Sequence, residues 1–119
     1  MEKEGKVSIW VGKFNSEEAL KEYVQEVFDE EGDSTSSFMN DFNIDYIDPQ
    51  FQEVDFNDQN NDLFQKINGF SYAESFINQL PILNEGINSV IRLYNFQFNN
   101  GIRKSEVLKY IGTYDYTIE

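Results

Sequence analysis

The stretch KVSIWVG, residues 6–12, alternates apolar and polar side chains in the pattern of a β-strand. One face of this strand would carry Val7, Ile9 and Val11, and the other face would carry Ser8 and Trp10. Two alternatives follow for Trp10. It either fills a core on the second face of the sheet, or it lies exposed there, where an indole is suited to anchor an interface.

The next segment, NSEEALKEYVQEVFDEEG at residues 15–32, is typical of an amphipathic helix. Asn15 is the expected N-cap, with Glu18 three residues later as in a capping box. We therefore expect a helix over roughly residues 16–30, closed by Gly32. Its outer face carries like charges four residues apart, which oppose a helix: Glu18, Glu22, Glu26 and Glu30.

The segment after Gly32 is less regular. A loop is expected at residues 33–37, then a helical turn through Phe38 and Phe42, then a short extended piece at residues 44–47. Asp48 and Pro49 are typical of an N-cap and a first helical residue. They predict a short helix through Phe51 and Val54, followed by an exposed polar loop at residues 56–62.

The C-terminal third predicts one helix and two strands. SYAE, residues 71–74, matches a capping box, and Pro81 would stop the helix that it begins. SVIRLYNFQF (89–98) and EVLKYIGTYDY (106–116) are strand-like, and the Asn-Gly turn signal at residues 99–101 predicts that they form a β-hairpin. The order of elements favours one α+β domain over residues 1–119, with helices packed on one face of a largely antiparallel sheet.

The negative charge of the chain is concentrated in its middle. The net charge is −13, and no Lys or Arg falls between Lys21 and Lys66. Residues 22–65 hold 13 of the 22 acidic side chains, so the remaining 22 − 13 = 9 acids balance the 9 bases of the flanks. The whole imbalance therefore lies in one segment.

Two interpretations of this acidic segment stand side by side. It is either a solvated face that keeps the protein soluble, or a docking face for a cationic partner, whose approach a single-sign surface accelerates. The second interpretation argues against nucleic acid and against an anionic membrane as partners, because both carry phosphate charge. The candidate partner-binding residues are Trp10, Asp41, Asp45, Tyr46, Asp48, Glu53, Asp55 and Asp58.

The sequence argues against several kinds of catalytic and metal-binding chemistry. The chain has no cysteine and no histidine, which removes thiolate chemistry and the side chain most used for proton transfer near neutral pH. The stretch from Asp55 to Lys66 begins like an EF-hand loop but has Asn60 where Gly is needed and Lys66 where Glu is needed. We therefore predict a protein that is not an enzyme and that holds no cofactor and no metal.

The location of the protein is predicted from what the sequence lacks. The N-terminus MEKEGKVSIWVG has no apolar run of signal-peptide length, and no stretch of about 18 uncharged apolar residues occurs. We expect a cytoplasmic protein.

Several of these stretches together resemble the immunity protein 22 family of bacterial polymorphic toxin systems. The resemblance covers most of the chain and includes VSIWVG (7–12), FNIDYID (42–48), GFSY (69–72), VIRLYNF (90–96) and YIGTYDY (110–116). Asn43 stands where the family pattern has Gly, and Gln50 stands where an acid is common. The resemblance implies a small cytosolic protein that binds a cognate toxin domain and protects the producing cell, without catalysis.

Many toxin domains in such systems are nucleases with basic clefts, which an acidic inhibitor is able to occupy in place of nucleic acid. The leading hypothesis is thus an immunity protein whose acidic, aromatic-bearing surface meets a basic toxin domain. The alternative is an acidic adaptor or regulatory binding module for another basic protein, and an enzyme ranks third.

Overall fold

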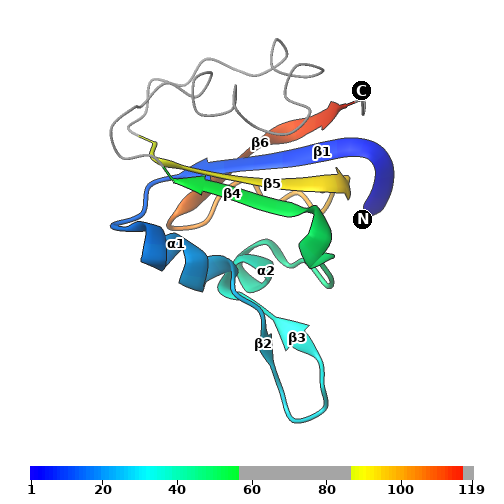
Figure 1. Ribbon diagram of the computed structural model, residues 1–119. Helices are drawn as coiled ribbons and strands as arrows, with labels where there is room; N and C mark the ends of the chain where they lie inside the picture. The colour runs from blue at the N-terminus through cyan, green and yellow to red at the C-terminus, as the bar shows by residue number, and fades with distance from the viewer. Residues whose placement is uncertain (57–86, 117–119) are drawn as a thin grey trace.

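The computed structural model describes residues 1–56 and 87–116 of the chain (Figure 1). The elements, in chain order, are β1 (Glu2–Gly12), α1 (Glu17–Val24), β2 (Val27–Phe28), β3 (Ser34–Thr35), α2 (Ser37–Phe42), the 3-10 helix η1 (Pro49–Phe51), β4 (Gln52–Phe56), β5 (Ser89–Phe96) and β6 (Leu108–Asp115). The helix predicted to begin at Ser71 lies outside the described residues, as does Asp58.

Four strands form one antiparallel sheet in the order β4-β5-β1-β6, and β2 and β3 form a separate two-stranded sheet. Both helices lie on the same side of the large sheet (Figure 1). The prediction of an α+β fold with a largely antiparallel sheet and helices on one face is therefore confirmed.

The β-hairpin predicted for residues 89–116 is wrong. Both strands exist as β5 and β6, but β1 lies between them, and its Trp10 pairs with Ile91 on one side and Tyr110 on the other. β1 is suited to this central position, because its residues 7–11 are all buried. Pairing with β1 on both sides buries more apolar surface than a local turn at residues 99–101 would.

The first helix is shorter than predicted. Ser16, not Asn15, is the N-cap, and its Oγ accepts a hydrogen bond from the Ala19 N–H at 3.1 Å. The helix ends at Val24, and Gln25 already has an extended backbone. A continued helix would have placed the acids of residues 26–31 at its negative C-terminal end, where the helix dipole opposes them. Val27 and Phe28, both good strand formers, instead begin β2.

The irregular segment is partly as predicted. The helical turn through Phe38 and Phe42 is α2, which ends at Asn43 in the left-handed conformation with φ 54°. This conformation is the one that a glycine adopts without strain, and asparagine tolerates it better than most residues. No strand forms at residues 44–47, where Ile44 and Ile47 are buried in the core.

Asp48 is the N-cap of η1, as predicted, and its carboxylate accepts a hydrogen bond from the Gln50 N–H at 3.0 Å. The helix predicted to continue through Val54 is wrong, because Val54 belongs to β4. Pairing of β4 with β5 satisfies the backbone groups of residues 52–56 that face β5.

The large sheet is apolar on both faces. Val7, Ile9 and Val11 pack on one face with Val90 and Tyr94, as the alternation of residues 6–12 predicts. The other face carries the larger aromatic cluster, which α1 and α2 cover: Trp10, Phe14, Phe38, Phe42, Phe98 and Tyr110. Burial on both faces makes β1 the centre of the fold.

Candidate partner-binding site

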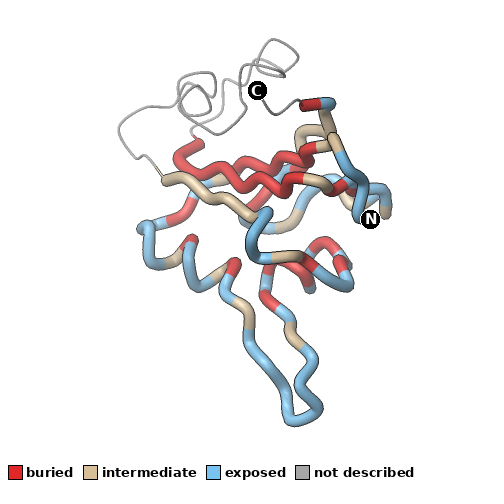
Figure 2. Tube along the Cα trace, turned by 45° about the vertical axis from the view of Figure 1, so that its right-hand side comes forward, coloured by how far each residue is buried: buried red, intermediate tan, exposed pale blue. Residues whose placement is uncertain are grey.

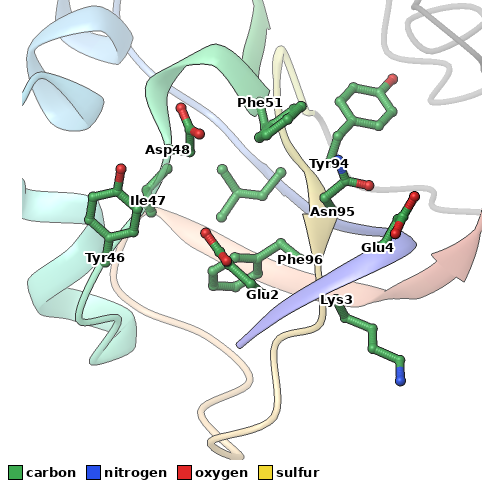
Figure 3. A pocket seen from close by; sticks show the side chains of 11 residues that line it. Glu2, Lys3, Glu4, Tyr46, Ile47, Asp48, Phe51, Tyr94, Asn95 and Phe96 are labelled. Atoms are coloured by element: carbon green, nitrogen blue, oxygen red, sulfur yellow. The ribbon is translucent and has the colours of Figure 1, made fainter.

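A pocket of about 380 Å³ opens where the acidic segment meets the start of β1 and the end of β5 (Figure 3). We call it the acidic pocket, and it is lined by Glu2, Lys3, Glu4, Tyr46, Ile47, Asp48, Phe51, Leu93, Tyr94, Asn95 and Phe96. Two of the predicted partner-binding residues, Tyr46 and Asp48, are therefore brought together in one pocket.

The acidic pocket combines carboxylates with exposed rings. Glu2, Glu4 and Asp48 supply three negative charges, and the Lys3 side chain extends away from the opening that Glu2 and Tyr46 border (Figure 3). Tyr46 is 56% exposed and Phe51 is 39% exposed, so both rings offer apolar surface at the rim. Carboxylates beside aromatic rings suit a cationic side chain, which gains charge-assisted hydrogen bonds and ring contact together.

The buried isoleucines hold this segment in place. Ile44 and Ile47 are buried in the aromatic cluster, whereas Asp45 and Tyr46 between them are exposed. The Asp48 cap then turns the chain into η1, which carries Phe51 to the pocket. The polar and aromatic side chains are thus presented outward because the aliphatic ones are anchored inward.

An irregularity in the pairing of β1 with β5 brings the first residues of the chain to the pocket. The register shifts between Glu2, which pairs with Phe96, and Val7, which pairs with Tyr94. Asn95 lies opposite the shift with φ 54°, and its Oδ1 accepts hydrogen bonds from the Gly5 N–H at 3.1 Å and the Tyr116 hydroxyl at 2.6 Å. Bulges of this kind bend a strand and re-aim its side chains.

Glu2 and Glu4 were not among the residues predicted to bind a partner. They lie more than 40 residues from Tyr46 in a neutral flank of the chain, so the charge count did not single them out. Gly5 gave no bulge signal in the sequence, because it precedes the alternating pattern of residues 6–12.

Glu53 forms an ion pair within the sheet. It lies opposite Arg92 across β4 and β5, and its Oε2 is 2.5 Å from Arg92 Nη2. Arg92 is buried, and its Nη1 donates a hydrogen bond to the Tyr94 hydroxyl at 2.7 Å. Burial lowers the pKa of Arg92, an effect that Tyr94 and Glu53 oppose, and burial raises the pKa of Tyr94 to about 12. Glu53 therefore balances a buried cation.

The other predicted residues are scattered. Asp41 is exposed on α2 and accepts a hydrogen bond from the Tyr23 hydroxyl at 2.6 Å. Burial raises the pKa of Tyr23, and this hydrogen bond raises it further. Asp45 is exposed beside Tyr46, and Asp55 is half-buried on β4. The predicted residues thus do not all form one surface within the described part of the chain.

Trp10 is a core residue. Its exposed fraction is 0%, and its indole has ring contacts at 4.9–5.8 Å between centroids with Phe38, Phe42, Phe98 and Tyr110. The expectation of an exposed indole that contacts a partner is therefore wrong, and the alternative of a core indole is correct. The cause is the position of α2, which covers the face of β1 on which Trp10 lies.

No group of three or more acidic side chains within residues 1–56 and 87–116 is arranged to hold a metal ion. In the same part of the chain, no helix has the length and apolar character needed to cross a membrane.

The fold is that of a small acidic α+β domain, with a pocket lined by carboxylates and aromatic rings. The family model for immunity protein 22 matches residues 7–117, and the chain belongs to that family. Neither a curated protein nor a solved structure matches the chain. Membership of this family supports a toxin-neutralising immunity role, in which the chain binds a cognate toxin and acts without catalysis.

Proposed function

We propose that this chain neutralises a cationic toxin domain, a nuclease by our hypothesis, by binding it one to one through the acidic pocket. The observation that carries the proposal is the convergence of Tyr46 and Asp48 with Glu2 and Glu4 around one opening. These residues come from two distant parts of the chain, and the bulge at Gly5 and the cap at Asp48 hold them there.

Charge would guide the encounter. A net charge of −13 attracts a basic domain from a distance and repels nucleic acid and anionic membranes. Single-sign surfaces raise association rates by about 10- to 1,000-fold at low salt, whereas each exposed ion pair adds only about 0–1 kcal/mol. The acidic pocket therefore sets the speed and the choice of partner more than the final affinity.

The aromatic rings of the acidic pocket would slow dissociation of the complex. A lysine or arginine side chain of the toxin entering the pocket would desolvate Tyr46 and Phe51 while its charge meets Asp48. Buried aromatic and arginine contacts carry most of the energy in protein interfaces and mainly slow dissociation. Such binding in the cytoplasm would protect the producing cell.

Reversing the charge of the pocket rim is expected to slow association. The pocket variant, Glu2→Lys/Glu4→Lys/Asp45→Lys, reverses two acids that line the pocket and the exposed acid that precedes Tyr46 in the chain. Its association rate should fall by about 10- to 1,000-fold at low salt. Asp48 is left in place because it caps η1. The measurement is stopped-flow or biosensor binding to the toxin-like domain encoded beside the gene for this chain, at several salt concentrations.

The matched control changes the net charge by the same amount on exposed acids outside the pocket, in the control variant Glu18→Lys/Glu22→Lys/Glu106→Lys. It should slow association much less. Equal rates for the two variants would show that the pocket is not the contact, and unchanged rates in both would make the acidity a solubility feature.

A further inference from the structure

The β2–β3 hairpin stands apart from the body of the protein. It projects from the side of the helices away from the large sheet (Figure 1), and it is exposed along most of its length (Figure 2). Its two strands pair with each other through Val27 with Thr35 and Phe28 with Ser34. A two-stranded hairpin on its own is of marginal stability in water.

The apolar side chains of this hairpin are both exposed. Val27 is 62% exposed and Phe28 is 66% exposed, the highest values among the large apolar residues of the described chain. They are consecutive in one strand, so they point to opposite faces of the hairpin. A hairpin that packs against the body would cover one of the two. Here both faces offer an apolar contact.

The tip of the hairpin is held by its own hydrogen bonds. Asp29 Oδ1 accepts from the Glu31 N–H at 2.9 Å and from the Asp33 N–H at 3.0 Å, and the Asp29 N–H donates to the Asp33 carbonyl at 2.9 Å. Gly32 supplies the left-handed residue of the turn, with φ 85°. These bonds fix the tip before any partner arrives, which lowers the entropy cost of binding.

The charge of the tip indicates which kind of partner the hairpin is able to bind. Its exposed acids are Asp29, Glu30, Glu31 and Asp33, within a stretch from residue 22 to residue 65 that has no Lys or Arg. A second copy of this chain, itself at −13, would be repelled. A partner surface that accepts the four carboxylates of the tip must be cationic. It must also have apolar walls to contact Val27 and Phe28, which lie behind the tip.

We infer that the β2–β3 hairpin inserts into a cationic cleft of the toxin domain, with Val27 and Phe28 each contacting one wall. The inference rests on the proposed function and adds a second contact to the acidic pocket. A projection with two apolar faces is complementary to a cleft rather than to a flat surface, because a flat partner would leave one face in water. A cleft with this charge is one that binds a polyanion such as a nucleic acid.

The test uses the whole chain and the catalytically silenced toxin-like domain encoded beside its gene. The variant Val27→Ala/Phe28→Ala should dissociate about 10- to 100-fold faster than the wild type. The matched control is Val107→Ala, which truncates a valine that is exposed outside both the hairpin and the acidic pocket, and it should change the rate by less than about twofold. Unfolding followed by the fluorescence of Trp10, the single tryptophan, should be the same for all three proteins.

A second measurement locates the contact. A photo-crosslinking residue, Phe28→p-benzoylphenylalanine, should capture peptides that line the cationic cleft of the toxin domain, and a short single-stranded DNA that fills the cleft should abolish the capture. Unchanged dissociation of the double variant, or capture outside the cleft, would overturn the inference. If dissociation of the double variant is unchanged while the pocket variant still associates slowly, only the hairpin inference fails. If the wild type does not bind the toxin domain, the proposed function fails as well.

Discussion

Replacing Trp10 with alanine is expected to lower the free energy of unfolding by about 3–5 kcal/mol. The indole is fully buried between β1 and α2, in contact with four aromatic rings. Truncation removes these contacts and leaves a cavity that neighbours fixed on a sheet and a helix are able to close only in part.

The measurement is denaturant unfolding followed by far-UV circular dichroism, because the variant has no tryptophan. The comparison is Tyr46→Ala, whose ring is exposed and whose removal should change stability by less than about 0.5 kcal/mol. Toxin binding should show the opposite order of effects. Tyr46→Ala should weaken binding more than Trp10→Ala does, since Tyr46 lines the acidic pocket. A Trp10→Ala variant as stable as the wild type would contradict the core position of the indole.

Glu53→Gln is expected to cost about 2–3 kcal/mol of stability, because it removes the charge that balances Arg92. Arg92 is buried, and Glu53 is its carboxylate partner at 2.5 Å. The side chain of Glu53 is 37% exposed, so water partly compensates and the cost stays below that of a fully buried pair.

Asp115→Asn makes the same chemical change in a surface ion pair. Asp115 is also 2.5 Å from its partner Lys6, but its side chain is 77% exposed, so the loss should stay below about 1 kcal/mol. Thermal and denaturant unfolding at neutral pH measure the loss of stability in Glu53→Gln and in Asp115→Asn. Equal losses would show that burial of Arg92 does not govern the strength of its pair.

The sequence predicts the features that depend on neighbours in the chain. The two faces of residues 6–12, the helical turn through Phe42 and the Asp48 cap follow from spacing and side-chain chemistry alone. The α+β class follows from the order of these elements.

Features that depend on distant partners were not predictable in the same way. The strand-turn-strand pattern of residues 89–116 carries a local hairpin signal, but it holds no information that β1 inserts between the two strands. The burial of Trp10 depends on α2, and the ion pair of Glu53 depends on Arg92, a residue 39 positions away. Local patterns set strand faces and caps, whereas packing between distant segments decides the register and the neighbours of each strand.

Two of the motifs that carry the family resemblance lie in neighbouring strands of the sheet. VSIWVG and YIGTYDY pair with each other, with Ile9 opposite Gly112 and Trp10 opposite Tyr110. Ser8 Oγ lies 2.7 Å from Thr113 Oγ1 and accepts a hydrogen bond from the Phe98 N–H. These two motifs hold the fold. Two others, FNIDYID and VIRLYNF, contribute residues 46–48 and 93–96 to the lining of the acidic pocket, whereas the β2–β3 hairpin lies outside all of these stretches.

We propose that the chain neutralises its toxin in the cell by binding it through the acidic pocket. The most direct measurement is the survival of cells that express the toxin-like domain encoded beside this gene, together with low levels of the wild type, the pocket variant or the control variant. We predict that the wild type and the control variant protect the cells and that the pocket variant does not. Death of the cells despite the wild type, or equal protection by both variants, would contradict the claim.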